Sequence, residues 1–511
     1  MAKKEVILCI DRGTSELKVM FYDRNGRSCG MTQRHCSVLS SRPDWLEADL
    51  EETYGQLIDA VSALVESTRE AELEVVCIAI TSYMSGTIFL DKAGNVVGPA
   101  VLWNDSRTQK LTEEWERTGV LEKNFEVSGS QILTGWPIPL LSWWKQNDPA
   151  LLEQADVVLN MKDWLRYKLT GTIGTDVTEA VLSPGDVRTR GYSDEVLRLF
   201  DVYEYKRLLP PVAEPEVIAG ELKEDVARAM HLSPGIPVVI GIGDMPSGVL
   251  GTGALLCGHG SSVLGTTFLN GLIVDEPQPE PKNAGMTCAY VEQHLLRMVN
   301  NTGGAAINYQ WFIDQFFAAE KEQYGKGIFD YIDSVVANAP PGCNGVMYHP
   351  YINSCGVTAP FLSIGARAQF TGIGLHTTRE EMLRAIYESI GLAMRDCYSS
   401  VPVRLVDITL TGGGSKSAVL CQIIADVCQV PVLVQLEKEA TALGAGIVGA
   451  VGVGMYANYA QAIGQMVHPE KTYYPREERK ALYDQLYGLY VKVRNGMMEP
   501  WELRRSLSSG Q

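Results

Sequence analysis

Two stretches of the chain, roughly 250 residues apart, share one design, and this repeat constrains the fold more than any other feature. Residues 5–22 are predicted to form a strand, a polar tip that includes Asp11, Gly13 and Thr14, and a second strand. Residues 261–274 repeat this design, with a tip at residues 265–267. Such a repeat indicates a duplicated domain. Two tips that face each other across a cleft could bind the phosphates of a nucleotide, because backbone N–H groups and hydroxyls suit phosphate oxygens.

Length and composition set the general class of protein. A chain of 511 residues is too long for one hydrophobic core, which favours about two to four domains. The net charge of −17 argues against a nucleic acid or an anionic membrane as partner, since both attract basic surfaces. The 11 cysteines form no CxxC pair, which favours reduced core thiols over metal ligands or disulfides. Because no signal-peptide pattern or long uncharged apolar run occurs, we expect a cytoplasmic location.

An acidic residue follows a predicted buried strand in the middle of the chain. The apolar run at 237–240 leads into Gly241, Gly243 and Asp244. Glycines permit a tight turn and the close approach of a ligand, and open α/β sheets bind ligands where parallel strands end. We therefore interpret Asp244 as a general base. The alternative is a turn aspartate that precedes a helix.

A loop at residues 103–108 combines aromatic, amide, acidic and guanidinium groups. An indole suits the apolar C–H face of a sugar, and the polar groups suit its hydroxyls. We therefore expect a neutral polyhydroxylated ligand here. The alternative is a capped loop that precedes a helix expected at 113–117.

Three consecutive glycines at residues 412–414 lie between a predicted strand and a helix expected at 418–427. The glycines allow close backbone approach, and the start of a helix favours negative charge, so this loop is predicted to bind a ligand. The chain contains no GxxxxGK[ST] motif, which argues against a Walker loop, and the loop at 412–414 does not fit GxGxxG, which argues against a dinucleotide site. The small, glycine-rich helix at 442–452 indicates tight helix packing at a hinge.

In this order, the features resemble the FGGY carbohydrate kinases, members of the actin–hexokinase–heat-shock-ATPase superfamily. Residues 368–388 fit the second signature of that family, and residues 135–147 fit the first except at Leu140, where the family usually has Lys. The resemblance implies an α/β fold of two ribonuclease-H-like domains, each with a five-stranded sheet, and a catalytic cleft between them. Residues 1–255 would bind the sugar and supply the base, whereas residues 256–511 would bind ATP and end in a helical tail.

The resemblance also assigns roles to individual residues. It implies ATP and Mg²⁺ as cofactors, Asp244 as the catalytic base, and Asp11 with Asp244 as the residues that hold Mg²⁺ through water. The residues that it implies in nucleotide binding are Arg12, Gly13, Thr14, Gly265, Thr266, Thr267, Gly304, Gly413, Gly414 and Ser417. Those that it implies in sugar binding are Tyr83, Met84, Ser85, Trp103, Asn104, Asp105, Arg107, Asp244 and Met245.

The substrate follows less directly from the resemblance. Residues 103–108 resemble the sugar loop of xylulose kinases, but those enzymes usually carry Met-His where this chain has Met84 and Ser85, and glycerol kinases carry Arg-Glu. A ketopentose such as xylulose or ribulose is the leading expectation. A four-carbon polyol or ketose (erythritol, erythrulose) is the alternative, and glycerol is less favoured.

Two alternatives belong to other classes of protein. One is a non-kinase ATPase of the same superfamily, namely a chaperone or filament protein, and the other is an inactive sugar-binding regulator. The sequence leaves the oligomeric state open, with a homodimer as one option.

Overall fold

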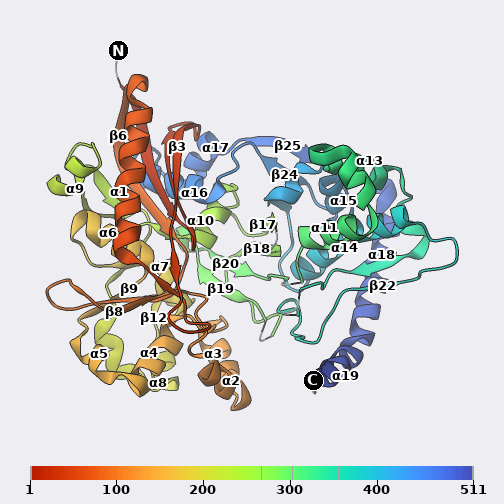
Figure 1. The fold of residues 1–511 in the computed structure, drawn as a ribbon, viewed down its shortest axis with the longest axis horizontal. Coiled ribbons are helices and arrows are strands. Elements are labelled where there is room, and N and C mark those ends of the chain that lie inside the picture. The colour runs from red at the N-terminus through yellow and green to blue at the C-terminus, as the bar shows by residue number, and fades with distance from the viewer. Residues whose placement is uncertain (1–2, 266–267, 283, 302, 354–355, 509–511) are drawn as a thin grey trace.

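The computed structural model describes residues 3–265, 268–282, 284–301, 303–353 and 356–508. Within these residues the chain forms two seven-stranded sheets, one in each half (Figure 1). The strands of the first sheet, in spatial order, are β14 (Ile218–Glu221), β15 (Pro237–Val239), β6 (Leu73–Ser82), β1 (Lys4–Arg12), β2 (Glu16–Asp23) and β3 (Ser28–His35), with β16 (Ile242–Gly243) also paired to β6. The strands of the second sheet are β19 (Met286–Ala289), β20 (Leu295–Met298), β18 (Phe268–Val274), β17 (His259–Leu264), β23 (Asp407–Thr411), β24 (Val432–Gln435) and β25 (Pro469–Tyr473).

The two sheets share one topology over five strands. In the first sheet, β3, β2 and β1 are antiparallel to one another in turn, and β6 and β15 then run parallel to β1. The second sheet repeats this arrangement in the order β20, β18, β17, β23 and β24. The predicted duplication and the predicted α/β class are therefore confirmed. Each sheet has seven strands where five were expected, because β14 and β16 extend the first and β19 and β25 extend the second.

The first sheet is buried on both faces. Side chains along a strand alternate between the two faces. Val6, Leu8 and Ile10 pack in the cluster that contains α1 (Leu50–Ser67), whereas Ile7 and Cys9 pack in the cluster that contains α16 (Ala440–Gly452). A helix from the second half of the chain thus covers one face of the first sheet.

Helices of the second half cover one face of the second sheet. Its core contains Ile408 and Leu410 of β23 together with residues of the long helix α14 (Arg379–Ser399), which a Thr378–Glu381 capping box begins. The other helices of this half are α11 (Ala306–Phe316), α12 (Ala318–Tyr324), α13 (Ile328–Asn338), α15 (Ala418–Cys428), α17 (Tyr459–Met466), α18 (Lys480–Gly496) and α19 (Met498–Ser508).

The halves meet where α10 (Asp244–Gly251) crosses α16. A Cβ atom at Gly444 would lie 1.8 Å from the carbonyl oxygen of Ser247, and one at Gly251 would lie 1.8 Å from that of Ala440. Both positions therefore require glycine, which explains the composition of the predicted small-residue helix. The predicted boundary between two domains at residue 255 stays a prediction. Helix α16 comes after this boundary in the sequence, yet it packs against the sheet of the first half.

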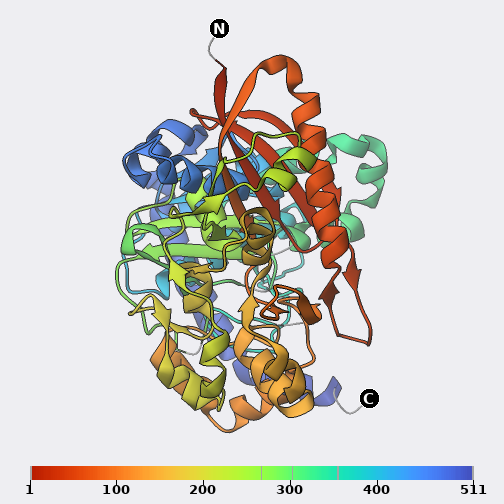
Figure 2. The same ribbon diagram turned by 90° about the vertical axis from the view of Figure 1, so that its left-hand side faces the viewer.

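A smaller lobe lies below the first sheet and forms the lower end of the molecule in Figure 2. It contains a five-stranded sheet, β4 (Val38–Leu39), β5 (Glu47–Ala48), β8 (Val96–Val101), β7 (Thr87–Leu90) and β9 (Val157–Leu159). Its helices are α2 (Gln109–Arg117), α3 (Val120–Ser128), α4 (Pro137–Asn147), α5 (Pro149–Gln154) and α8 (Asp194–Leu199). Across the described ranges, no helix combines the length and apolar character that a membrane span requires.

Candidate active site

Three parallel strands end at the same edge of the first sheet and present the predicted first-half residues there. In the register of the sheet, Asp11 of β1 and Ile242 of β16 both pair with Thr81 of β6. Asp11, the segment at 83–85 and Asp244 therefore leave the sheet together, at the carboxyl ends where α/β sheets bind ligands. The structure brings these predicted residues together as expected.

Asp244 is the first residue of α10, directly after β16. Its Oδ1 accepts a hydrogen bond of 2.7 Å from the backbone N–H of Met245. Burial and, after it, the negative charge of Asp11 raise the pKa of Asp244 to about 7. A carboxyl group with that pKa can accept a proton near neutral pH.

Asp11 is the second carboxylate at this edge. Burial raises its pKa to about 7, Lys18 opposes that rise, and Glu439 adds to it. Lys18 forms an ion pair of 2.7 Å with Glu439, which directly precedes α16. This ion pair was not predicted from the sequence. The only indication in the sequence was the position of Glu439, a carboxylate directly before a glycine-rich helix. The pair connects β2, the strand that follows the first polar tip, with the second half of the chain.

Arg12 is fully buried beside the tip. Its Nη1 donates hydrogen bonds to the carbonyls of Gly13 and Thr14, and its guanidinium lies 5.7 Å from the ring centre of Tyr83. The Arg12 side chain thus holds the tip from inside, and its contact with a nucleotide stays a prediction. Gly13 and Thr14 are half-buried and stay accessible.

The predicted sugar loop lies next to this tip. The indole Nε1 of Trp103 donates a hydrogen bond of 3.0 Å to Thr14 Oγ1, and both Trp103 and Asn104 are exposed. Gly135, in the first family signature, packs directly beneath, since a Cβ atom there would lie 2.1 Å from the carbonyl oxygen of Trp103. Leu140 of the same signature is fully buried in the hydrophobic core, on α4.

Asp105 and Arg107 do not face this loop's surface. Their side chains are fully buried and form an ion pair of 2.8 Å, and Arg107 also pairs with Glu47 at 2.7 Å. Asp105 further accepts a hydrogen bond from the backbone N–H of Leu46. Both side chains therefore support the loop from inside, and their contacts with a sugar stay a prediction. The pattern of residue types does not indicate which side chains point inward.

The segment at residues 83–85 is uncharged and buried. Met84 packs against the turn before Asp244, since a Cβ atom at Gly243 would lie 2.6 Å from its sulfur. Ser85 has a φ of +69°, and its backbone N–H donates a hydrogen bond of 3.0 Å to Glu179. Tyr83 lies against Arg12, as described above.

In the second half, the tip after β17 and the triple-glycine loop lie side by side. The parallel pair β17–β23 aligns Val263 with Thr411, so Gly265 and Gly412 leave the sheet at one edge. Gly412 has a φ of +84°, and a Cβ atom there would lie 2.8 Å from the carbonyl oxygen of Leu264. The predicted residues Thr266 and Thr267 lie outside the described residues.

Four further predicted nucleotide contacts lie close to this edge. Gly413 is exposed and Gly414 packs on Leu264. Ser417 Oγ accepts from the N–H of Leu420, which caps α15, and donates to Asp333 at 2.7 Å, so its hydroxyl is already occupied. Gly304 has a φ of +92° and precedes α11.

A cleft of about 350 Å³ connects the two edges. Both halves contribute to its lining, which includes Asp244, Met245, Thr411, Gly412, Glu439 and Thr441. Asp244 of the first half and the glycine loop of the second half thus face one space. This is the arrangement that transfer of a group from a nucleotide to a second ligand requires.

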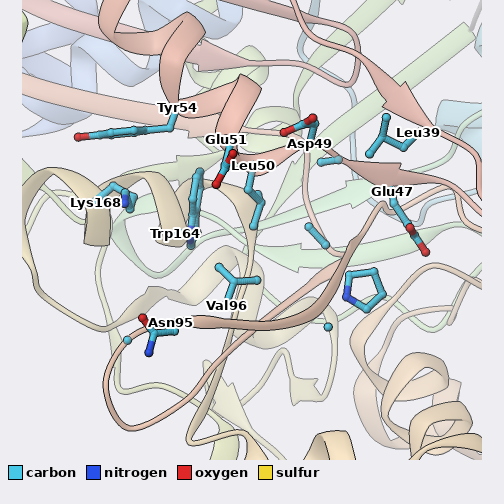
Figure 3. A pocket seen from close by; sticks show the side chains of 15 residues that line it. Leu39, Glu47, Asp49, Leu50, Glu51, Tyr54, Asn95, Val96, Trp164 and Lys168 are labelled. Carbon is cyan, nitrogen blue, oxygen red and sulfur yellow. The ribbon is translucent and has the colours of Figure 1, made fainter.

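A separate surface groove of about 640 Å³ lies outside this cleft (Figure 3). Tyr54 of α1 and Trp164 of α6 (Met161–Thr170) line it, and the Lys168 ammonium lies 4.7 Å from the Tyr54 ring centre. None of the predicted site residues lines this groove.

Comparisons with known proteins agree with this architecture. The FGGY family of carbohydrate kinases matches twice: its N-terminal domain over residues 6–251, and its C-terminal domain over residues 260–453. The chain belongs to the FGGY family of carbohydrate kinases. Kinases of this family use ATP as phosphate donor, which confirms the predicted enzyme class and nucleotide. The alternative of a chaperone or filament ATPase is therefore discarded.

Individual relatives cover almost the whole chain. Erythritol kinase of Brucella abortus is 28% identical over 519 residues, which cover 100% of this chain and 99% of that protein. Probable L-xylulose kinase of Haemophilus influenzae is 26% identical and covers 95% and 97%, respectively. The crystal structure of gluconate kinase from Lactobacillus acidophilus matches with a TM-score of 0.87 at 23% identity, over 98% of this chain and 99% of that one, and shows the shared fold.

Proposed function

We propose that this kinase transfers the γ-phosphoryl group of ATP to a terminal hydroxyl of a small neutral sugar, with a ketopentose such as xylulose or ribulose as the leading candidate. The observation that carries the proposal is the position of Asp244, which shares one strand edge with the uncharged segment 83–85 and one cleft with Gly412. A neutral ligand suits residues 83–85, because they bring no charge to the pocket.

The reaction needs little covalent chemistry from the protein. The sugar hydroxyl oxygen forms a bond to the γ-phosphorus, the bond between that phosphorus and the leaving ADP oxygen breaks, and Asp244 accepts the hydroxyl proton. Thr14 and the backbone of Gly13 and Gly265 would hold the phosphoryl oxygens. Gly413 and Gly414 would lie beside the adenosine and its α-phosphate.

Asp11 and Asp244 fit the predicted Mg²⁺. Both are half-buried, and the charge of Asp11 raises the pKa of Asp244, a repulsion that a cation would relieve. Among the described residues no group of three or more acidic, His or Cys side chains is arranged around one point. Two carboxylates suit Mg²⁺ that keeps waters and binds phosphate oxygens. When bound, the ion would neutralise charge on the transferring group.

A four-carbon polyol is the second candidate. The specific observation in its favour is the similarity to an erythritol kinase over the full length of both chains. The similarity to a probable L-xylulose kinase supports the ketopentose at nearly the same identity. The uncharged segment 83–85 would suit either neutral ligand.

Release of ADP over a panel of acceptors tests the proposal. The panel contains D- and L-xylulose, D- and L-ribulose, erythritol, erythrulose, glycerol and gluconate, with kcat/KM measured for each. We expect a ketopentose to rank first and gluconate last. Erythritol in first place would select the second candidate, preference for gluconate would contradict a neutral pocket, and ADP release that no acceptor increases would overturn the sugar-kinase proposal. The predicted cytoplasmic location and the homodimer stay predictions.

A further inference from the structure

Five ionisable side chains are buried together behind the cleft, and the mechanism above does not use them. This buried ionic cluster consists of Lys162, Asp163, Arg166, Asp176 and Glu179, all between 0% and 3% exposed. Lys162 pairs with Asp163 at 2.6 Å and with Asp176 at 3.0 Å, and Arg166 pairs with Asp163 at 2.8 Å. Burying charges costs free energy that the pairing seldom exceeds. Stability alone is therefore a weak explanation for the cluster.

The cluster holds both ends of the turn that precedes the base. Arg166 Nη1 donates a hydrogen bond of 2.9 Å to the carbonyl of Ile240. At the other end, the backbone N–H of Gly243 donates one of 3.1 Å to Thr178 Oγ1, on α7 (Val177–Leu182). Thr178 Oγ1 in turn donates to Asp176 at 2.5 Å. A chain of contacts thus runs from buried Lys162, through Asp176 and Thr178, to the residue before Asp244.

The neighbouring residue of α7 holds the substrate segment. Glu179 Oε2 accepts the hydrogen bond from the Ser85 N–H, and Ser85 has the left-handed backbone that costs about 1 kcal/mol for a residue with a side chain. A hydrogen bond at this point compensates for that cost. Adjacent residues of one short helix therefore contact the two loops whose relative position sets the distance from base to hydroxyl. Helix α7 also packs against β16 and β19, which fixes it between the two sheets.

We propose that Thr178 and Glu179 are positioning residues, which fix the base and the substrate segment relative to one another. This inference rests on the proposed function, because Asp244 is the base and residues 83–85 are the sugar contacts only in that proposal. Thr178 controls the orientation of Asp244 through Gly243, and Glu179 controls the backbone of Ser85. Neither residue touches the reacting atoms. Displacements of about 1 Å in such a support can reduce turnover roughly 100-fold.

Steady-state kinetics separate the two positions, with the panel member of highest kcat/KM as acceptor. Thr178→Val removes the hydroxyl and should lower kcat about 10- to 100-fold, with both KM values within about twofold of wild type. Thr178→Ser keeps the hydroxyl and should stay within about threefold in kcat. Glu179→Leu should raise the KM for the acceptor about tenfold and leave the KM for ATP unchanged, whereas Glu179→Gln keeps an acceptor oxygen and should be milder.

Thr53→Val is the matched control. Thr53 is a fully buried threonine on α1, and its hydroxyl has no hydrogen-bond partner among the described residues, so this change should leave kcat and KM unaltered. Thr178→Ala replaces Thr178→Val if the valine variant does not fold. A folded Thr178 variant without the hydroxyl that keeps wild-type kcat would overturn the proposal, as would a serine variant no better than valine.

Amide hydrogen exchange provides a readout that needs no catalysis. Loss of the Thr178 hydroxyl should increase exchange at Gly243 at least tenfold, and Glu179→Leu should do the same at Ser85, with Thr53→Val as the unchanged reference. Unchanged exchange at both amides overturns the positioning roles. If the wild-type protein phosphorylated no acceptor, the proposed function would fail. Amide exchange at Gly243 and Ser85 would still show whether Thr178 and Glu179 hold these two loops, so the two failures are distinguishable.

Discussion

The indole Nε1 of Trp103 donates a hydrogen bond of 3.0 Å to the hydroxyl of Thr14, and so joins the loop at residues 103–108 to the first polar tip. Trp103→Phe keeps an aromatic surface but removes the donor. One hydrogen bond contributes about 0.5–1.5 kcal/mol, so we expect kcat/KM for the acceptor to fall roughly three- to tenfold. Steady-state kinetics with ADP release would measure this loss.

A double-mutant cycle supplies the control for this pair. Thr14→Val removes the acceptor of the same bond, and the combined variant should lose less than the sum of the two single losses, with a coupling free energy of about 1 kcal/mol. Purely additive losses would show that the bond does not connect the two loops in function.

Asp244→Asn should lower kcat by about three orders of magnitude or more, because an amide of the same size cannot accept the hydroxyl proton. ATP affinity, measured by calorimetry, should change by less than about threefold, since the glycine loop that is expected to bind the nucleotide lies in the other half of the chain. A loss of kcat below tenfold would remove Asp244 from the role of base.

The sequence predicted those parts of the site that depend on local chain geometry. The strand, polar tip and strand around Asp11 are confirmed, as is the acidic residue after the mid-chain strand, because alternating apolar residues and glycine turns are local signals. The parallel register that brings Asp11 and Asp244 to one edge was expected from the general behaviour of α/β sheets.

The direction and partners of side chains could not be predicted in this way. Asp105 and Arg107 turn inward because Glu47 and Leu46, far away in sequence, provide partners for them. Lys18 and Glu439 are separated by 421 positions, and no local pattern indicates that pairing. The same reason explains why the support of Asp244 by α7 became visible only in the structure.

The crossing of α10 and α16 gives a stability prediction. Gly444→Ala would place a Cβ atom 1.8 Å from the carbonyl oxygen of Ser247, so backbone must move, and we expect a loss of about 3 kcal/mol or more. Activity should fall as well, since α10 begins with Asp244. Thermal unfolding and kcat would be measured together.

Gly464→Ala is the matched control for that change. Gly464 lies in α17, and a Cβ atom at this position would meet no other atom of the described residues within 4 Å. The substitution should therefore stabilise the helix by about 0.5–1 kcal/mol through helix propensity. Equal effects of the two alanines would contradict the close crossing of the helices.

His349 gives a prediction for the pH dependence of stability. It is fully buried at the end of β21 (Met347–His349), where its Nε2 donates a hydrogen bond of 3.1 Å to the carbonyl of Tyr490. Burial lowers its pKa to about 4, from an ordinary value of 6.5. The folded state therefore favours the neutral ring, and the stability that His349 contributes is present above pH 6.5 and is lost as the pH falls towards 4.

Between pH 7.5 and pH 5.0 the difference corresponds to about 2 kcal/mol of unfolding free energy. His349→Gln cannot take up this proton, so its urea midpoint should fall less than that of wild type over this interval, even if it starts lower at pH 7.5. His376→Gln is the control, because this exposed ring already reaches water, and it should follow wild type. The same pH response in wild type and His349→Gln would show that the protonation of His349 does not limit the acid stability of the second half.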